Sequence, residues 1–169
     1  MDATALKAMQ APLKERYRDQ PETATITLKA EGRLSEGVSC SVQTSKALIA
    51  AGLHPATGGD GTFACSGDML LEALVACAGV TMNAVATALE IELRDATVRA
   101  EGDLDFRGTL GVAKDAAVGF KSIRLSFDVD TDASEDQLAT LLKLTERYCV
   151  VLQTLANPAQ LSSAIERRS

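Results

Sequence analysis

Residues Ser66 to Glu90 read SGDMLLEALVACAGVTMNAVATALE and form a long, almost uninterrupted apolar stretch. Ser66 is a good N-cap, because its hydroxyl can accept a hydrogen bond from a free N–H group of the first helical turn. Asp68 falls in that turn, where a carboxylate complements the positive end of the helix dipole. A helix that is apolar on every side has to be buried. The stretch therefore predicts a central helix that the rest of the chain surrounds.

The composition indicates a soluble protein. Hydrophobic residues make up 46% and charged residues 24% of the 169 residues, which is typical of a single globular domain over residues 1–169. The net charge of −6 argues against nucleic acid or an anionic membrane as a partner. The first 20 residues lack a basic start followed by a long apolar segment, so we expect no signal peptide and a cytoplasmic location. A membrane-spanning role for the apolar stretch is disfavoured by four polar residues within it, Glu72, Thr81, Asn83 and Thr87.

The cysteines are better interpreted as thiols than as a disulfide framework, because a cytoplasmic location keeps thiols reduced. No two of them form a CxxC pair, and His54 is the only histidine. A zinc site would need an unusual set of ligands, so we expect neither a metal nor a bound cofactor. The four cysteines are Cys40, Cys65, Cys77 and Cys149.

The chain before the central helix is expected to contain one helix, one hairpin and a loop. Apolar residues at helical spacing within 1–20 predict an amphipathic N-terminal extension that stops before Pro21. Alternating residues predict a hairpin, in which Cys40 is a small core residue. The expected segments are strand 24–30, turn 31–37, strand 38–42, one or two helical turns over 45–51 capped by Gly52, and a glycine-rich loop from His54 to Cys65, in which His54 is exposed.

After the central helix, strands and helices are not expected to alternate strictly, which favours an α+β fold over a parallel α/β fold. A strand over 98–106, a connection over 108–119 and a strand with one wet face over 123–129 come first. Ser134 and Gln137 then form a capping box that begins a second helix. That helix ends near Cys149, Asn157 and Pro158 close the following segment, and a last strand is expected over 160–166.

Cys77 and Cys149 are the candidate reactive residues, with opposite expectations for their pKa. Burial in an apolar helix should raise the pKa of Cys77, and most buried cysteines are inert, so its reactivity would require a nearby cation or hydrogen-bond donors. The apolar residues after Cys149 can begin a new helical turn, and a thiol at a helix N-terminus has a lowered pKa. Their distance in sequence does not establish that the two cysteines meet. A direct bond from Cys65 to Cys77 is disfavoured, because both would lie on one helix.

Two segments resemble those that carry the cysteines of the OsmC/Ohr family. Ser66 to Met82 resembles the first cysteine helix, and RYCVVLQTLANP, from Arg147 to Pro158, resembles the second cysteine segment. The glycine-rich loop before the first helix and the strand GFKSIRLSFDVD fit as well. The similarity extends over about residues 58–158.

This resemblance implies two long central helices packed on antiparallel sheets, in an intertwined homodimer with active sites at the interface. It also implies thiol-dependent reduction of organic hydroperoxides in oxidative stress defence. Cys77 would be the peroxidatic cysteine that becomes a sulfenic acid, and Cys149 the resolving cysteine that forms a disulfide with it. A lipoyl group or a small thiol would be the external reductant.

The chain departs from the family at the charged residues around the first cysteine. Peroxidase members have an arginine from the first hairpin and a Pro-Glu pair, whereas this chain has Ser66 and Gly67 at the places of that pair. Asp68 is the nearest acid, and Arg33 is the candidate arginine, although the hairpin register leaves its partner open. Val150 replaces the proline that usually follows the second cysteine. These departures leave two alternatives: a non-enzymatic protein that binds a small apolar or thiol-reactive ligand at the dimer interface, and a redox sensor.

Overall fold

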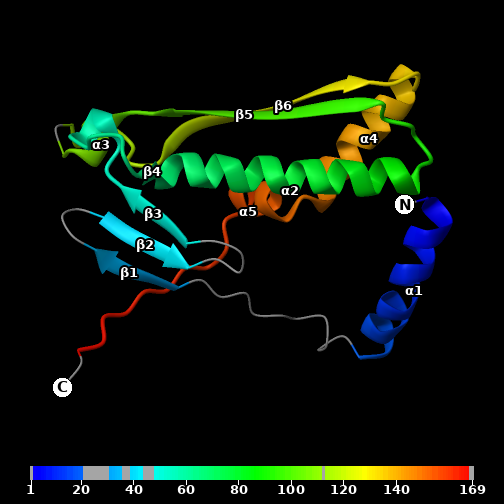
Figure 1. The fold of residues 1–169 in the computed structure, drawn as a ribbon, viewed down its shortest axis with the longest axis horizontal. Helices are drawn as coiled ribbons and strands as arrows, with labels where there is room; N and C mark the ends of the chain where they lie inside the picture. The colour runs from blue at the N-terminus through cyan, green and yellow to red at the C-terminus, as the bar shows by residue number, and fades with distance from the viewer. Residues whose placement is uncertain (1, 21–30, 36–38, 44–47, 112, 168–169) are drawn as a thin grey trace.

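The computed structural model describes residues 2–20, 31–35, 39–43, 48–111 and 113–167, and Figure 1 shows their arrangement. The helix α2 runs through the centre of the molecule, with the long strands β5 and β6 on one side. The elements in chain order are α1 (Ala3–Asp19), β1 (Glu31–Ser35), β2 (Ser39–Gln43), β3 (Leu48–Gly52), the 3-10 turn η2 (Pro55–Thr57), β4 (Ala64–Cys65), α2 (Ser66–Ala88), β5 (Asp95–Leu104), α3 (Phe106–Thr109), β6 (Phe120–Asp130), α4 (Glu135–Tyr148) and α5 (Val150–Ala156).

Helix α2 is the predicted central helix, with a different N-cap. Cys65 is the N-cap and makes no side-chain capping bond, so the prediction of Ser66 in that role is wrong. Residue 65 closes the short strand β4, and its extended backbone is the conformation that an N-cap needs, whereas Ser66 is already helical. By length and composition α2 could span a membrane, a test that core helices of soluble proteins also pass.

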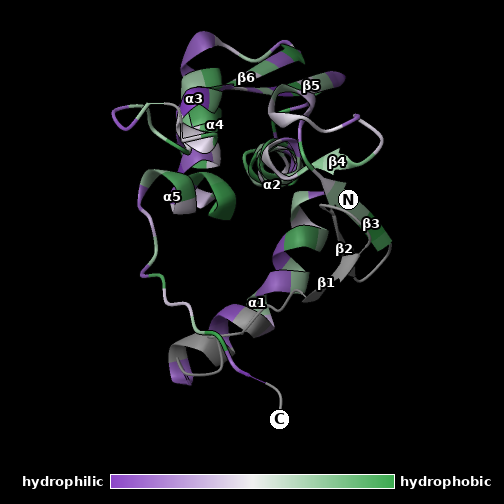
Figure 2. Cartoon of the chain, turned by 90° about the vertical axis from the view of Figure 1, so that its left-hand side faces the viewer, coloured by the Kyte–Doolittle hydropathy of each residue, from purple (hydrophilic) through white to green (hydrophobic). Residues whose placement is uncertain are grey.

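One stripe of α2 is buried, rather than its whole circumference. Leu74, Ala78, Met82 and Ala86 recur every four residues and lie inside. They belong to two core clusters, one with Leu141 and Ile91 and one with Cys149. Figure 2 looks along α2 and shows β5 and β6 on one side and α5 on another. The opposite stripe of Ala73, Ala76 and Val80 stays exposed in the single chain, with Val80 73% exposed, so the expectation of burial on all sides is not met within one chain.

The strands β5 and β6 form an antiparallel pair whose outer face is charged. Arg99 lies 3.6 Å from Asp128, and Arg124 bonds Glu101 and Asp103 across the ladder. The inner residues of both strands pack against α2 through the clusters described above. This arrangement confirms the predicted strand with one face in water.

The second sheet differs from the prediction. Residues 31–35, expected in a turn, form β1, and residues 48–52, expected to be helical, form β3. The sheet has the order β1-β2-β3-β4, so its strands obtain their hydrogen bonds from neighbours that local propensity does not reveal. The predicted strand 24–30 lies outside the described residues.

The chain end also differs. Residues 160–166 form no strand, and Leu161 and Ile165 are fully exposed, because no described strand lies beside them. In Figure 1 this segment leads away from α5. A run of suitable residues is not sufficient for a strand when no ladder partner is available.

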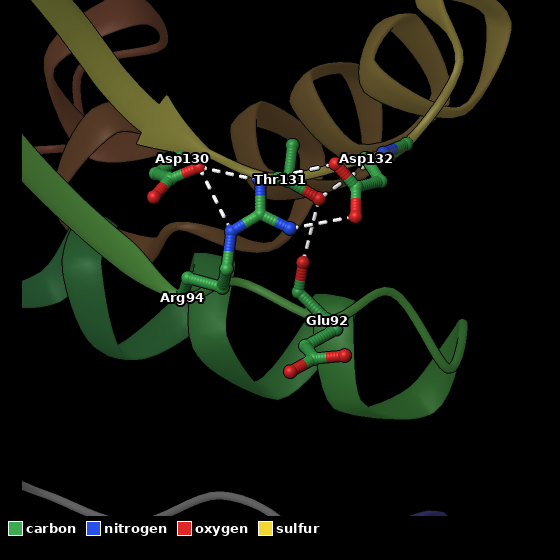
Figure 3. A network of polar contacts seen from close by, with 6 residues as sticks. Glu92, Arg94, Asp130, Thr131 and Asp132 are labelled. Atoms are coloured by element: carbon green, nitrogen blue, oxygen red, sulfur yellow. Dashed lines mark hydrogen bonds and ion pairs between the residues drawn. The ribbon is translucent and has the colours of Figure 1, made fainter.

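An exposed polar network fixes where α4 begins (Figure 3). Arg94, after α2, donates to Asp130 at the end of β6 at 2.6 Å and to Asp132, between β6 and α4, at 2.7 Å. The Thr131 hydroxyl donates to the carbonyl oxygen of Glu92 at 2.6 Å. The predicted capping box of Ser134 and Gln137 follows directly and is confirmed. Together these contacts set the position of α4, which carries Cys149 at its end.

Candidate functional site

The structure brings Cys77 and Cys149 together. Cys77 lies in the middle of α2, and Cys149 lies at the break between α4 and α5. Cys149 is fully buried with Leu74 and Ala78, and Cys77 packs against the same cluster while keeping part of its surface exposed. A partly exposed thiol beside a fully buried one is the arrangement that a first and a second reacting sulfur require.

The break at Cys149 is built by hydrogen bonds on both of its sides. Its N–H donates to the carbonyl oxygen of Thr145 at 2.9 Å, which ends α4, and its own carbonyl accepts from Gln153 at 2.9 Å, which begins α5. The Gln153 side chain also donates to the Glu146 carbonyl oxygen at 2.9 Å and braces the two helices. The backbone of Cys149 is extended, with φ −72° and ψ 104°. The free N–H groups at the start of α5 are therefore held beside the sulfurs.

Hydrogen bonds lower the pKa of Cys77 despite its burial. Burial acts to raise the pKa, but the backbone N–H groups of Val151 and Val150 and the thiol of Cys149 favour the thiolate and outweigh it. A hydrogen bond from the Thr81 hydroxyl would also lower the pKa of Cys77. That hydroxyl has a single hydrogen, however, and donates it to the carbonyl oxygen of Cys77 at 2.7 Å. We therefore attribute the shift chiefly to the N-terminus of α5 and to Cys149.

The pKa of Cys149 is shifted the other way, so the expectation of a lowered pKa at this residue is wrong. Burial raises the pKa of the Cys149 thiol, and the sulfur of Cys77 raises it further, while the N–H groups of Leu152 and Val151 lower it less. A helix begins after Cys149, as predicted, but at this sulfur its N–H groups do not outweigh the effects of burial and of Cys77. The sequence predicts this helix N-terminus, whereas the action of its N–H groups on Cys77 depends on how α5 packs against α2.

The two charged candidates are placed away from this pair or are not described. Asp68 lies nine residues before Cys77 on α2, about 13 Å along the helix axis. Arg33 lies in β1 opposite Ser41, and Cys40 lies in β2, but the side chains of both lie outside the described residues. In the part of the chain that is described, the groups that lower the pKa of Cys77 are hydrogen-bond donors and none is a cation.

A pocket of about 340 Å³ lies at the N-terminus of α2. It is lined by His54, Cys65, Gly67, Asp68, Leu71, Gly102, Asp103, Leu104, Phe106 and Phe120. Gly67 has no side chain, so this volume is open where the family resemblance would place a glutamate. His54 is half-buried rather than exposed as expected, because its ring stacks on Phe106 at 4.9 Å and its Nδ1 accepts from Ala56.

A groove of about 410 Å³ runs along another face of α2, and Cys77 is not among the residues that line it. Apolar side chains from Leu71, Val75, Ala76 and Ala100 form most of its wall, with Asp68 and Glu72 at its edge. This groove suits an alkyl chain better than a charged ligand. Among the described residues no group of three His, Cys, Asp or Glu side chains could hold a metal ion.

Comparisons with known proteins identify solved structures with a similar fold. A structure of an OsmC-like protein from Mycoplasma pneumoniae has a TM-score of 0.67 at 19% identity, over 79% of this chain and 89% of that one. A structure from Legionella pneumophila, described as an organic hydroperoxide resistance protein OsmC, has a TM-score of 0.62 at 18% identity, over 78% and 90%. One from Elizabethkingia anophelis, described as an organic hydroperoxide resistance protein, has a TM-score of 0.61 at 15% identity, over 79% and 91%.

At these identities the structural neighbours establish the fold, which is an α+β arrangement of two long helices on sheets. The strands of these sheets are antiparallel except for β3 and β4, which pair in parallel and so depart from the expected antiparallel sheets. No curated protein matches the chain in sequence. The family model for OsmC-like proteins matches residues 59–163, which include both cysteines of the pair. The chain therefore belongs to the OsmC-like protein family.

Proposed function

We propose that this protein reduces organic hydroperoxides with Cys77 as the nucleophile, in oxidative stress defence. The observation that carries the proposal is the lowered pKa of Cys77, caused by the N-terminus of α5 and by Cys149 against the effect of burial. The reactive form of a cysteine is its thiolate, so this environment prepares Cys77 for attack. Two structural neighbours described as organic hydroperoxide resistance proteins support the same substrate class.

In the first step the Cys77 thiolate attacks the terminal oxygen of the hydroperoxide. The O–O bond breaks, an alcohol leaves after taking a proton, and Cys77 becomes a sulfenic acid. The apolar residues packed around the two cysteines, such as Leu74, Val151 and Leu155, favour an organic hydroperoxide over hydrogen peroxide, because an alkyl group needs an apolar surface.

In the second step Cys149 resolves the sulfenic acid. Its sulfur attacks the sulfur of Cys77, the S–S bond forms, the S–O bond breaks, and the oxygen leaves as water with the proton that Cys149 gives up. An external dithiol, such as a lipoyl group or a pair of small thiols, then restores both cysteines by thiol–disulfide exchange. The contact of both residues with one apolar cluster supports this pairing.

In the reduced protein Cys77 and Cys149 differ in how readily they lose their protons. The Cys149 thiol donates to the sulfur of Cys77 and retains its proton, because its own pKa is raised. Cys77 is thus the better nucleophile before oxidation, and Cys149 stays unreactive toward peroxide in the core. The α5 N–H groups supply the stabilisation that an arginine supplies in the peroxidase members that the sequence resembles.

We also propose that the protein is a cytoplasmic homodimer. The exposed stripe of Ala73, Ala76 and Val80 lies opposite the buried stripe of α2, and small residues allow a second helix to approach closely. The groove beside Ala76 borders this stripe. A second copy packed there would cover the stripe and close this groove.

The test is oxidation of the reduced protein with one equivalent of tert-butyl hydroperoxide, stopped by acid and followed by mass mapping of every thiol. We expect rapid formation of a Cys77–Cys149 disulfide, with Cys40 and Cys65 still reduced. Cys65→Ser is the matched control, and its rate should equal that of the unmodified protein. Slow or scattered oxidation that leaves Cys77 as a thiol would contradict the proposal.

The second candidate is a non-enzymatic protein that binds a small apolar ligand. The open pocket at Gly67, with Leu104, Phe106 and Phe120 in its wall, favours it. This candidate predicts that a fluorescent apolar probe binds saturably and that binding is unchanged in Cys77→Ala. A protein that binds such a probe and forms no disulfide with peroxide would have this function instead.

A further inference from the structure

Thr145 is a fully buried polar residue whose hydroxyl has no hydrogen-bond partner. Its side chain is 1% exposed, and its Oγ1 makes no hydrogen bond in the described structure. Buried polar groups are nearly always paired, so an unpaired one calls for a functional explanation. Thr145 is placed one helical turn before Cys149, which connects it to the thiol site.

Other threonines in the helices behave differently. The hydroxyls of four of them donate to the carbonyl oxygen four residues earlier, at 2.7 to 2.9 Å, and these are Thr81, Thr87, Thr140 and Thr154. Thr145 does not make the corresponding bond to Leu141, although it lies within the regular helix α4. Its hydroxyl is therefore available to another acceptor.

The geometry of α4 points to Cys149 as that acceptor. Leu141, Thr145 and Cys149 follow at intervals of four and share the buried face of the helix. The N–H of Cys149 still donates to the Thr145 carbonyl at 2.9 Å, so helical spacing is kept up to the break. Side chains on a helix lean toward its N-terminus, which directs the Cys149 sulfur over the turn that contains Thr145.

We propose that Thr145 is a positioning residue whose hydroxyl turns toward the sulfur of Cys149 and donates to it when that sulfur becomes a thiolate. The inference rests on the proposed function, because that thiolate is the species that attacks the sulfenic acid of Cys77. The step forms the S–S bond, breaks the S–O bond and releases water, with the proton of Cys149 on the leaving oxygen. Thr145 loses and gains no proton in this step.

The chemistry of the second step explains why such a donor is useful. Before oxidation Cys149 donates its hydrogen to Cys77, so it needs no donor of its own. After Cys77 is oxidised, Cys149 must ionise inside the apolar core, where the N–H groups of Leu152 and Val151 do not outweigh the effect of burial. A hydroxyl that is unpaired at rest becomes paired at this moment.

Two substitutions separate hydrogen bonding from packing. Thr145→Val keeps the shape and removes the hydroxyl, whereas Thr145→Ser keeps the hydroxyl and removes a methyl group. Both are made in a Cys40→Ser, Cys65→Ser, Cys77→Ser background, where Cys149 is the only thiol and its ionisation is followed by ultraviolet absorbance against pH. We expect Thr145→Val to raise the pKa of Cys149 by about one unit, a tenfold loss of thiolate, and Thr145→Ser to leave it near the parent value.

The control is Thr140→Val on the same helix, whose hydroxyl bonds Asp136 and which should leave the pKa of Cys149 unchanged. In the chain with all cysteines, Thr145→Val should slow disulfide formation about tenfold at pH 7 and leave the first step within about twofold. Thermal unfolding of Thr145→Val should occur no lower than in the parent, because an unpaired buried hydroxyl is removed.

The outcomes distinguish this inference from the proposed function. An unchanged pKa of Cys149 in Thr145→Val would overturn the inference, even with full peroxidase activity. A shifted pKa in a protein that forms no disulfide with peroxide would support the pairing of Thr145 with Cys149 and would overturn the peroxidase function. A loss in Thr145→Ser equal to that in Thr145→Val would assign Thr145 to packing and would also overturn the inference.

Discussion

At the scale of single residues, the chemistry depends on which of two adjacent sulfurs holds the proton. Burial alone would raise the pKa of both cysteines. At Cys77 the hydrogen-bond donors outweigh burial and lower the pKa, whereas at Cys149 they do not. Cys149 supplies one of those donors, so in the proposed mechanism the resolving sulfur also activates the nucleophile. This division of roles makes single substitutions at the two residues distinguishable.

The first prediction concerns those substitutions. Cys77→Ser should lower the rate of hydroperoxide consumption by about a hundredfold or more, because the nucleophile is lost. Cys149→Ser should allow one oxidation per chain and stop there, with a sulfenic acid that a 1,3-dione probe traps at Cys77. Peroxide consumption and mass mapping measure both results. Undiminished turnover in Cys77→Ser would remove Cys77 from the mechanism.

The second prediction is the pH dependence of the first step. The thiol form is unreactive, so the rate should rise with pH through the pKa of Cys77 and then level off. Because that pKa is lowered, the midpoint should lie at lower pH than for a short peptide with the same residues around Cys77. The single-turnover rate against pH measures it. Equal midpoints in protein and peptide would show that the donors of α5 do not act on this sulfur.

At the scale of elements, the break between α4 and α5 delivers the donors to the site. The backbone of Cys149 is extended, at φ −72° and ψ 104°, and this conformation suits a residue that precedes proline. Val150 occupies the first position of α5, where proline is favoured, and its side chain points largely into solvent. The break thus has the geometry of a Cys-Pro segment without the proline.

The third prediction follows from that geometry. Val150→Pro should fold with an unchanged or higher unfolding midpoint, because proline fits both positions. It removes one N–H donor and leaves that of Val151, which contributes more to Cys77. The pKa of Cys77 should therefore rise by less than about one unit. Thiolate absorbance and thermal unfolding test these two expectations, and a lowered pKa would contradict them.

The fourth prediction concerns the sheet that covers α2. An added methyl group at Gly102 would lie 2.4 Å from the ring of Phe120, whereas one at Gly79 of α2 would meet its nearest neighbour, Val98, at 3.7 Å. Gly102→Ala should lower the free energy of unfolding by about 1–3 kcal/mol through overpacking. Gly79→Ala is the matched control and should not be destabilising, because alanine favours helix. Chemical denaturation of both variants decides between them.

Elements with a local signal were predictable, and elements that depend on distant partners were not. Neighbouring residues determine the capping box at Ser134, the alternation in β6 and the helical turn after Cys149. The strands β1 and β3 depend on pairing with β2, and residues 160–166 have strand-forming residues without a ladder to join. The pKa order of the two cysteines was missed for the same reason, since it depends on how α5 meets α2.

At the scale of the whole molecule, α2 has more apolar surface than the single chain buries. Its buried stripe packs on β5, β6 and α4, while the opposite stripe of Ala73, Ala76 and Val80 meets solvent in the single chain. An exposed apolar stripe along the central helix is unfavourable in water and is typical of an interface. The proposed homodimer would remove it from solvent and close the groove beside Ala76.

The fifth prediction tests this assembly. Val80→Glu places a charge at the most exposed large apolar residue of the stripe and should convert a dimer into monomers, because burial of an unpaired carboxylate is costly. Val118→Glu is the control, since Val118 is 65% exposed and lies on the connection before β6, outside the exposed stripe of α2. Sedimentation at micromolar concentration should give a dimer for the parent and the control, and a monomer for Val80→Glu. A parent protein that sediments as a monomer would leave α2 exposed in solution and would contradict the dimer. If Val80→Glu is monomeric and still forms the Cys77–Cys149 disulfide with peroxide, the thiol pair works within one chain, and the second copy is not needed for this chemistry.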